Sequence, residues 1–276
     1  MSMNAALWKK AVSDAWLQLA VCSVLLVLFS WVFVWLMSLF PVGAFSTILR
    51  WMPSFVQPIV GVPLAELATP TGQLSILYVH AITLLLCVGW AVGRGSDPIS
   101  GEIGRGTMDL ILSLPIRRVE VLVAPAVVAA AGAAVLAASV SAGTLLGLKT
   151  VTLHGDVSLW KFFPGAVNLC AMTFCLTGVT ALFSSFNRDR WRTISLAAGF
   201  FVISFIIKMV GRLWSAGWWL KYCTFLSAFQ PQRLILVPDH SGLTALKCNL
   251  TLVLLGLTCY AAAGVIFSRR DIPAPL

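Results

Sequence analysis

The sequence predicts an all-α membrane protein with six transmembrane helices, and three observations support that fold class. Hydrophobic residues make up 59% of the 276-residue chain and charged residues only 11%, against about 25% charged residues in soluble domains. Six apolar runs are each long enough to cross roughly 30 Å of hydrocarbon. The charged residues lie mostly between these runs. We therefore expect one transmembrane domain over residues 1–276.

The predicted spans are separated by short connections and by two longer segments. The spans are 17–40, 74–92, 119–148, 165–186, 193–213 and 246–267. Ahead of them, residues 1–16 combine Trp8 and Trp16 with Lys9 and Lys10, which predicts an amphipathic helix at the membrane interface. The proline-rich segment 41–73 and the tryptophan-rich segment 214–245 are predicted to lie outside the bilayer as short surface or re-entrant helices.

The basic residues predict the orientation of the chain. With six spans, many of them fall on one side, at both termini and in two connections: Lys9, Lys10, Arg94, Arg105, Arg117, Arg118, Arg188, Arg190, Arg192, Arg269 and Arg270. The positive-inside rule makes that side cytoplasmic. We expect a multi-pass protein of the cell inner membrane with both termini in the cytoplasm. The net charge of +9 indicates anchoring to membrane lipid and not nucleic-acid binding, because no run of five or six basic residues is interleaved with aromatic residues.

The most distinctive segment, which we call the elbow, is residues 97–118, DPISGEIGRGTMDLILSLPIRR. It lies between the second and third predicted spans and carries charges at a density that hydrocarbon does not tolerate, so it is predicted to lie outside the bilayer. Its apolar positions recur at helical spacing with Thr107 in register, which predicts one shared helix face: Ile99, Ile103, Leu110 and Leu114.

Local signals divide the elbow into two short helices. Asp97 followed by Pro98 is typical of a helix start. Gly104 and Gly106 should break that helix, and Thr107 is positioned to cap a second one. Pro115 should end the second helix, because a proline disfavours helical geometry in the residue before it.

No motif for catalysis is present. The sequence lacks GxxxxGK[ST], HExxH and CxxC, and no acidic pair is buried in a span. We therefore predict no catalytic or metal-binding residues and no cofactor bound by this chain. Two alternative functions remain open, a membrane-embedded enzyme and a non-transport membrane anchor. Cys223 and Cys248 could pair if they face an oxidising compartment.

Two residues within or near the spans have alternative interpretations. Lys208, late in the fifth span, could extend its ammonium group to the interface, or face a central cavity and contact an anionic substrate group. His80, near the start of the second span, could lie at the interface or be hydrogen bonded within the bundle.

The stretch GEIGRGTMDLILSLPIRRVEVL resembles the segment between the second and third spans of permease subunits of ATP-binding-cassette exporters of the type-2 family. The matching positions are Glu102, Gly106, Thr107, Asp109, Leu110, Leu112, Ser113, Leu114, Pro115, Arg117 and Arg118. The family more often has glutamate where Asp109 stands. The ending FSRRDIP, residues 267–273, also resembles the family's ending, so the resemblance covers essentially the whole chain.

This resemblance to exporter permeases implies a non-catalytic subunit of an ATP-driven transporter that forms the substrate pathway. The elbow would contain a coupling helix that docks into a separate ATPase, through Glu102, Arg105, Gly106, Thr107, Asp109, Leu110, Leu112, Ser113, Pro115, Arg117 and Arg118. The partners would be two copies of that ATPase, which bind ATP and Mg, and a second permease chain in a homodimer or heterodimer. The first and fifth spans would line the substrate pathway, with Phe29, Phe33, Phe201, Phe205 and Lys208 as candidates. Neither the substrate nor the direction of transport is determined.

Overall fold

A computed structural model describes residues 5–39, 47, 51, 53, 56–113, 118–152, 157–237 and 242–269. In these residues every regular element is a helix. Six helical segments are long and apolar enough to cross a membrane: Ala5–Ser38, Pro70–Gly104, Arg118–Thr150, Leu159–Phe186, Arg190–Leu213 and Leu243–Arg269. The predicted fold class is confirmed.

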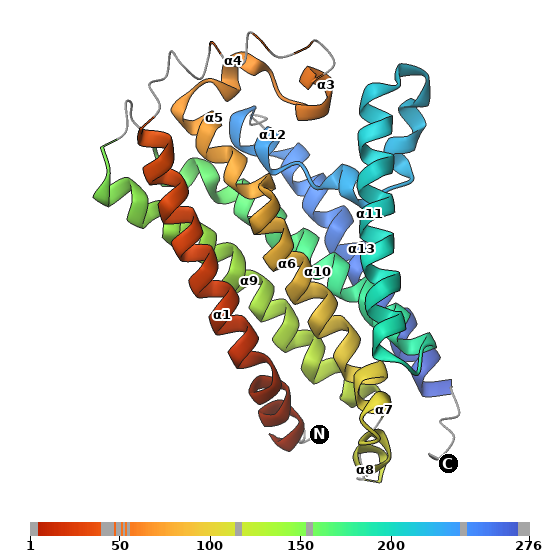
Figure 1. The fold of residues 1–276 in the computed structure, drawn as a ribbon. Helices are drawn as coiled ribbons and strands as arrows, with labels where there is room; N and C mark the ends of the chain where they lie inside the picture. The colour runs from red at the N-terminus through yellow and green to blue at the C-terminus, as the bar shows by residue number, and fades with distance from the viewer. Residues whose placement is uncertain are drawn as a thin grey trace.

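The six spans are built around long helices that run side by side (Figure 1). These are α1 (Ala5–Ser38), α6 (Ala81–Ser96), α9 (Arg118–Thr150), α10 (Phe163–Phe186), α11 (Arg190–Leu213) and α13 (Leu243–Arg269). At one end of the bundle lie the start of α1, the end of α13 and the elbow, whose described helices are η2 (Asp97–Gly101), α7 (Glu102–Gly104) and α8 (Met108–Leu112).

The other end of the bundle carries short helices, as the proline-rich and tryptophan-rich segments predicted. Before α6 these are α3 (Val56–Val60), α4 (Leu64–Leu67), α5 (Pro70–Ser75) and η1 (Ile76–Val79). The others are η3 (Leu159–Phe162), η4 (Ser215–Tyr222), η5 (Phe225–Ala228) and α12 (Pro231–Leu236). In Figure 1, α3, α4 and α12 all lie at the end opposite the elbow.

The prediction of a separate helix over residues 1–16 is wrong in the described part. A single helix, α1, runs from Ala5 to Ser38 without interruption. The reason is local, because residues 5–38 contain neither proline nor glycine. These are the two residues least favourable in a helix interior, so no strong signal ends the helix between the predicted surface segment and the first span.

The prediction of a helix start at Asp97 is also wrong. Asp97 has helical dihedral angles, φ −73° and ψ −44°, and α6 continues through the π-helix η2 into α7. Pro98 removes one backbone donor, and in an α-helix its ring would collide with the carbonyl four residues earlier. The wider turn of a π-helix leaves room for that ring, so the helix passes through the proline.

Close backbone contacts between helices depend on small residues. A Cβ atom on Gly132 of α9 would lie 2.0 Å from the ring of the fully buried Trp90. The Trp90 indole in turn donates a hydrogen bond of 3.0 Å to the carbonyl oxygen of Ala129. Between α10 and α13 two glycines meet, and a Cβ atom on Gly178 would lie 2.5 Å from the carbonyl oxygen of Gly256.

Gly178→Ala should therefore lower the free energy of unfolding by about 1–3 kcal/mol, the usual cost of overpacking. The new methyl group meets a backbone oxygen, which moves only if α13 moves. The matched control is Gly199→Ala in α11, where nothing lies within 4 Å of the added atom. Thermal unfolding of the detergent-solubilised protein, followed by tryptophan fluorescence, measures both variants. Equal midpoints for the two would contradict the close contact.

Candidate functional site: the elbow and its ion-paired base

The elbow reverses direction at Gly106, which has a positive φ of 71°. Glycine adopts this left-handed conformation without steric cost. The Gly106 amide donates to the carbonyl oxygen of Ile103 at 3.0 Å, and the Thr107 amide donates to that of Glu102 at 3.1 Å. The predicted break between two short helices is confirmed, with α7 on one side and α8 on the other.

Thr107 precedes α8, but it does not cap the helix with its side chain. Its hydroxyl group instead donates to Oε2 of Glu102 at 2.5 Å. The predicted capping role is wrong. As a donor to a carboxylate, the hydroxyl group makes a charge-assisted hydrogen bond, which is stronger than the cap bond it would accept from a neutral backbone amide. Thr107 therefore fastens α8 back onto α7.

Glu102 connects the elbow to the first helix. Its side chain is buried, with the residue only 3% exposed. Besides Thr107, its carboxylate contacts Nζ of Lys10 in α1 at 2.5 Å and a guanidinium nitrogen of Arg105 at 2.6 Å. A carboxylate buried this far requires such partners, so Glu102 holds α1 and the elbow together.

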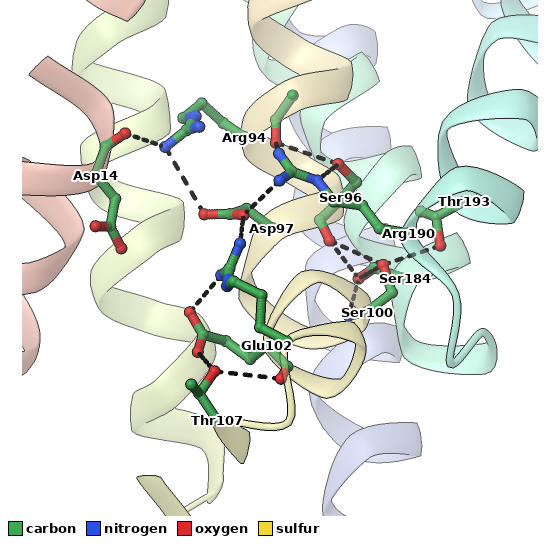
Figure 2. Close-up of polar contacts among 12 residues, drawn as sticks. Asp14, Arg94, Ser96, Asp97, Ser100, Glu102, Thr107, Ser184, Arg190 and Thr193 are labelled. Carbon is green, nitrogen blue, oxygen red and sulfur yellow. Dashed lines mark hydrogen bonds and ion pairs between the residues drawn. The ribbon is translucent and has the colours of Figure 1, made fainter. Parts of the chain in front are cut away.

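Asp97 is the second anionic centre at the base of the elbow. One of its oxygens lies 2.9 Å from the Arg105 guanidinium and 3.2 Å from that of Arg190 in α11. Its other oxygen lies 3.9 Å from the guanidinium of Arg94, which also donates to the carbonyl oxygen of Asp14 at 2.8 Å. Figure 2 shows Arg94 and Arg190 directed at Asp97 from different helices. This cluster therefore links α1, α6 and α11.

The charges of this cluster nearly balance. We call this cluster the clamp. It holds four cations and three carboxylates: Lys10, Arg94, Arg105 and Arg190 against Asp14, Asp97 and Glu102. Burial acts to lower the pKa of Arg105, but its hydrogen bonds to Asp97 and Glu102 outweigh this and raise the pKa above its ordinary value. The Arg105 guanidinium therefore stays charged at every physiological pH, and the clamp does not loosen by deprotonation there.

A group of buried hydroxyl groups extends the same junction to α10, and the sequence analysis missed it. The Ser100 amide donates to Oγ of Ser184 at 2.9 Å, and Oγ1 of Thr193 lies 3.0 Å from Oγ of Ser100. Ser184 also donates to the carbonyl oxygen of Ser96 at 3.2 Å. All four residues are fully buried, and Figure 2 shows them on the side of the cluster facing α10 and α11. The sequence signal was weak, because Ser184 and Thr193 lie 84 and 93 positions after Ser100.

The outer face of α8 is free of these contacts. Asp109, Leu110 and Ser113 are exposed, Leu110 to 71%, whereas Met108 and Ile111 are buried. The predicted single apolar face containing Leu110 is therefore wrong. The turn at Gly106 starts a new helix in a different direction, so helical spacing does not carry across it.

The eleven residues that the resemblance assigned to ATPase contact differ in their exposure to solvent. Five of them are exposed: Arg105, Gly106, Asp109, Leu110 and Ser113. Leu112 and Arg118 are half-buried, and Glu102 and Thr107 are hydrogen bonded to each other inside the elbow. Pro115 and Arg117 lie outside the described residues, as do Leu114 and Arg270.

A comparison with protein-family models decides the family. Residues 8–272 match the model described as "ABC-2 family transporter protein". The chain belongs to the ABC-2 transporter family. A search of curated proteins found no match. Members of this family are membrane components of ABC transporters and associate with an ABC ATPase, so this ABC-2 protein is a multi-pass transporter subunit.

The five predicted pathway residues of the ABC-2 subunit fall into two places. Phe201, Phe205 and Lys208 of α11 line one cavity. Phe29 and Phe33 lie instead on α1, where their rings stand 4.8 Å and 5.8 Å from the imidazole of His80. His80 caps α6, because its Nδ1 accepts a hydrogen bond from the Ile82 amide.

The cysteines of the ABC-2 subunit are all free thiols, so the proposed pairing of Cys223 with Cys248 is absent. Among the described residues, no group of histidine, cysteine and acidic side chains could hold a metal ion.

Replacing Asp97 tests the clamp. Asp97→Asn should reduce the free energy of unfolding by about 1.5–3 kcal/mol, the usual contribution of hydrogen bonds to a charged group, because three guanidinium groups lose their shared anion. Hydrogen–deuterium exchange of peptides within residues 97–113 should become faster. The matched control is Asp189→Asn, because Asp189 is half exposed and its ion pair with Arg192 is long, at 3.9 Å. Unchanged exchange in the Asp97 variant would contradict the clamp.

Proposed function

We propose that this chain is the permease subunit of an ABC exporter, which forms the substrate pathway and receives force from a separate ATPase through the outer face of α8. The observation that carries this proposal is the contrast within the elbow. One side of it is held to three helices by the ion pairs of Asp97 and Glu102, and the other side exposes Asp109, Leu110 and Ser113.

The clamp makes the elbow suited to transmitting a rigid-body movement. A force on α8 passes through the hydroxyl of Thr107 to Glu102, and from there to Lys10 of α1. Through Arg105 and Asp97 it also reaches Arg190 of α11. A segment held by several short contacts moves as a unit with the helices it touches, whereas a loose connection would absorb the displacement.

In this proposal the residues of the elbow have different tasks. Leu110 and Asp109 contact the ATPase directly, because they are exposed and lie on one turn of α8. Glu102 and Thr107 are positioning residues that hold α8 at a defined angle. The chain itself binds no nucleotide, and ATP and Mg bind to the partner.

The assembly proposed contains two ATPase subunits and a second permease chain, in a homodimer or heterodimer. The membrane surface of α11 supports a second permease, because this helix is the least buried of the six spans. Its exposed apolar residues include Val202, Ile203 and Ile206. Such a surface suits either lipid or another apolar helix.

We place the elbow and both termini in the cytoplasm and the chain in the inner membrane. The described basic residues near the elbow end of the bundle support this orientation: Lys9, Lys10, Arg94, Arg105, Arg118, Arg188, Arg190, Arg192 and Arg269. Fewer lie toward the opposite end: Lys149, Lys161, Lys208, Arg212, Lys221, Arg233 and Lys247. The positive-inside rule assigns the richer side to the cytoplasm.

Leu110→Ala tests the contact with the ATPase. Burying a leucine side chain stabilises a complex by about 1.5–3 kcal/mol, so Mg-ATPase activity that co-purifies with the tagged chain from its native membranes should fall roughly tenfold. The matched control is Leu85→Ala in α6, because Leu85 is also 71% exposed but lies away from the elbow. It should leave the co-purified activity unchanged.

Three results would contradict this proposal. Co-purified ATPase activity could be absent, it could be unaffected by Leu110→Ala, or ATP hydrolysis could come from the chain purified alone. The last result would favour a membrane-embedded enzyme, and the first a non-transport anchor.

Thiol labelling in sealed membrane vesicles tests the orientation. Cys223 is exposed near the end of the bundle opposite the elbow, so a membrane-impermeant maleimide should label it in right-side-out vesicles. In the Cys223→Ser background, the thiol introduced by Ser113→Cys should be labelled only in inside-out vesicles. The reverse pattern would place the elbow outside the cell and exclude contact with a cytoplasmic ATPase.

A further inference from the structure

A cavity of about 470 Å³ lies at the end of the bundle opposite the elbow. It is formed by the last turns of α11 together with α3, α4, η1, η5 and the start of α6. The start of α11 contacts Asp97 through Arg190, so the cavity and the elbow lie at the two ends of one helix. The volume is within the range of small-molecule sites, about 300–1,000 Å³.

The walls of this cavity are predominantly apolar. They include Ile59, Ile76, Leu84, Phe205, Met209 and Leu226. An apolar chain is the chemical group that such walls bind, because removing its methylene groups from water is favourable by about 0.8 kcal/mol each.

Two cations interrupt the apolar wall, and they stand one helical turn apart. The Lys208 ammonium donates to the carbonyl oxygen of Phe229 at 2.7 Å, and the Arg212 guanidinium donates to that of Ile59 at 2.5 Å. Among the described residues neither forms an ion pair, and no aspartate or glutamate lines the cavity. The neutral carbonyl groups accept some of the hydrogen bonds that Lys208 and Arg212 can donate, but they leave the two positive charges uncompensated.

A second, smaller cavity of about 40 Å³ shares these two cations. Its lining shares Gln232 with the large cavity and adds Gln230 and Arg233 together with Gly61, Val62 and Pro231. Arg233 is exposed, and its guanidinium donates to the side-chain oxygen of Gln230 at 3.4 Å. Lys208 and Arg212 thus stand between a large apolar chamber and a small chamber of mixed polarity that holds a third cation.

We propose that these joined cavities bind an amphiphile with an apolar chain and an anionic head, with the chain in the large chamber and the head among Lys208, Arg212 and Arg233. Like charges four residues apart on a helix repel each other, and cations removed from water require a counter-ion. An anionic head supplies one, and its oxygens can accept from all three side chains. As a statement about the exported substrate, the proposal rests on the proposed function.

The shared chemistry of an anion on an apolar chain has two sources, a membrane lipid and a free amphiphile. A phosphate, sulfate or carboxylate head satisfies the three cations equally well. The chain length and the number of chains separate the two sources, so they enter the experiment as separate arms.

Direct binding to the purified full-length chain in phosphatidylcholine nanodiscs tests the proposal. The probe is radiolabelled laurate, with dodecanol and dodecylamine as neutral and cationic competitors of the same chain length. Laurate should bind, unlabelled dodecyl phosphate should displace it, and dodecanol and dodecylamine should each compete at least about tenfold more weakly. Equal competition by all three head groups would overturn the proposal.

Three variants locate the bound probe. Lys208→Met and Arg233→Gln should each weaken laurate binding about tenfold or more, the usual effect of removing one partner of a charged contact. The matched control is Lys221→Met, because Lys221 lies toward the same end of the bundle against Trp218 and Tyr222 but outside both cavities. It should bind laurate within twofold of the unmodified chain. Arg233 is exposed, so its variant remains informative if the buried Lys208 variant fails to fold.

Phosphatidylglycerol and lysophosphatidylglycerol distinguish the two sources. Displacement of laurate by either lipid supports a membrane lipid as the occupant, and displacement by dodecyl phosphate alone supports a free amphiphile. Laurate binding that Lys208→Met and Arg233→Gln both leave unchanged contradicts the site. Because the assay contains no ATPase, its failure is distinct from failure of the co-purification experiment, which tests the elbow.

Discussion

The structure depends on the requirement that buried carboxylates be compensated by cations. Asp97 and Glu102 sit where a membrane-crossing helix passes into the elbow, and neither can be removed from water alone. Their partners come from other helices, Lys10 from α1 and Arg190 from α11. One electrostatic condition therefore determines where three helices meet, and it does so at the base of the elbow.

The two ends of α11 differ in how their charge is balanced. At the elbow end Arg190 shares the carboxylate of Asp97, while at the other end Lys208 and Arg212 have only backbone carbonyl groups as acceptors in the described chain. The distance along the helix from residue 190 to residue 212 is about 33 Å, at 1.5 Å per residue. A single unbroken helix thus connects a closed ion network with an apolar cavity that has unneutralised cations.

The elbow shows which local sequence signals were sufficient to predict its helices and turns. The break at Gly106 was predictable because its cause, a left-handed turn, is local. The helix start at Asp97 and the cap at Thr107 were equally strong local signals, yet both were wrong. A π turn accommodated Pro98, and the turn at Gly106 brought the carboxylate of Glu102, five residues earlier, within reach of the Thr107 hydroxyl. A single local preference therefore decides only where no neighbouring residue offers a stronger alternative.

Composition and periodicity alone determined the helical membrane fold, the order of its six spans and the position of the elbow, because hydrophobic length is a property of contiguous residues. Only the tertiary structure decided that Glu102 is buried and Leu110 exposed, that Lys208 lines a cavity with Phe201 and Phe205 but not with Phe29 or Phe33, and that Ser100 bonds to Ser184. Those facts depend on pairs of residues separated by up to about 90 positions, which come together only when the helices pack. No pattern within one span carries that information.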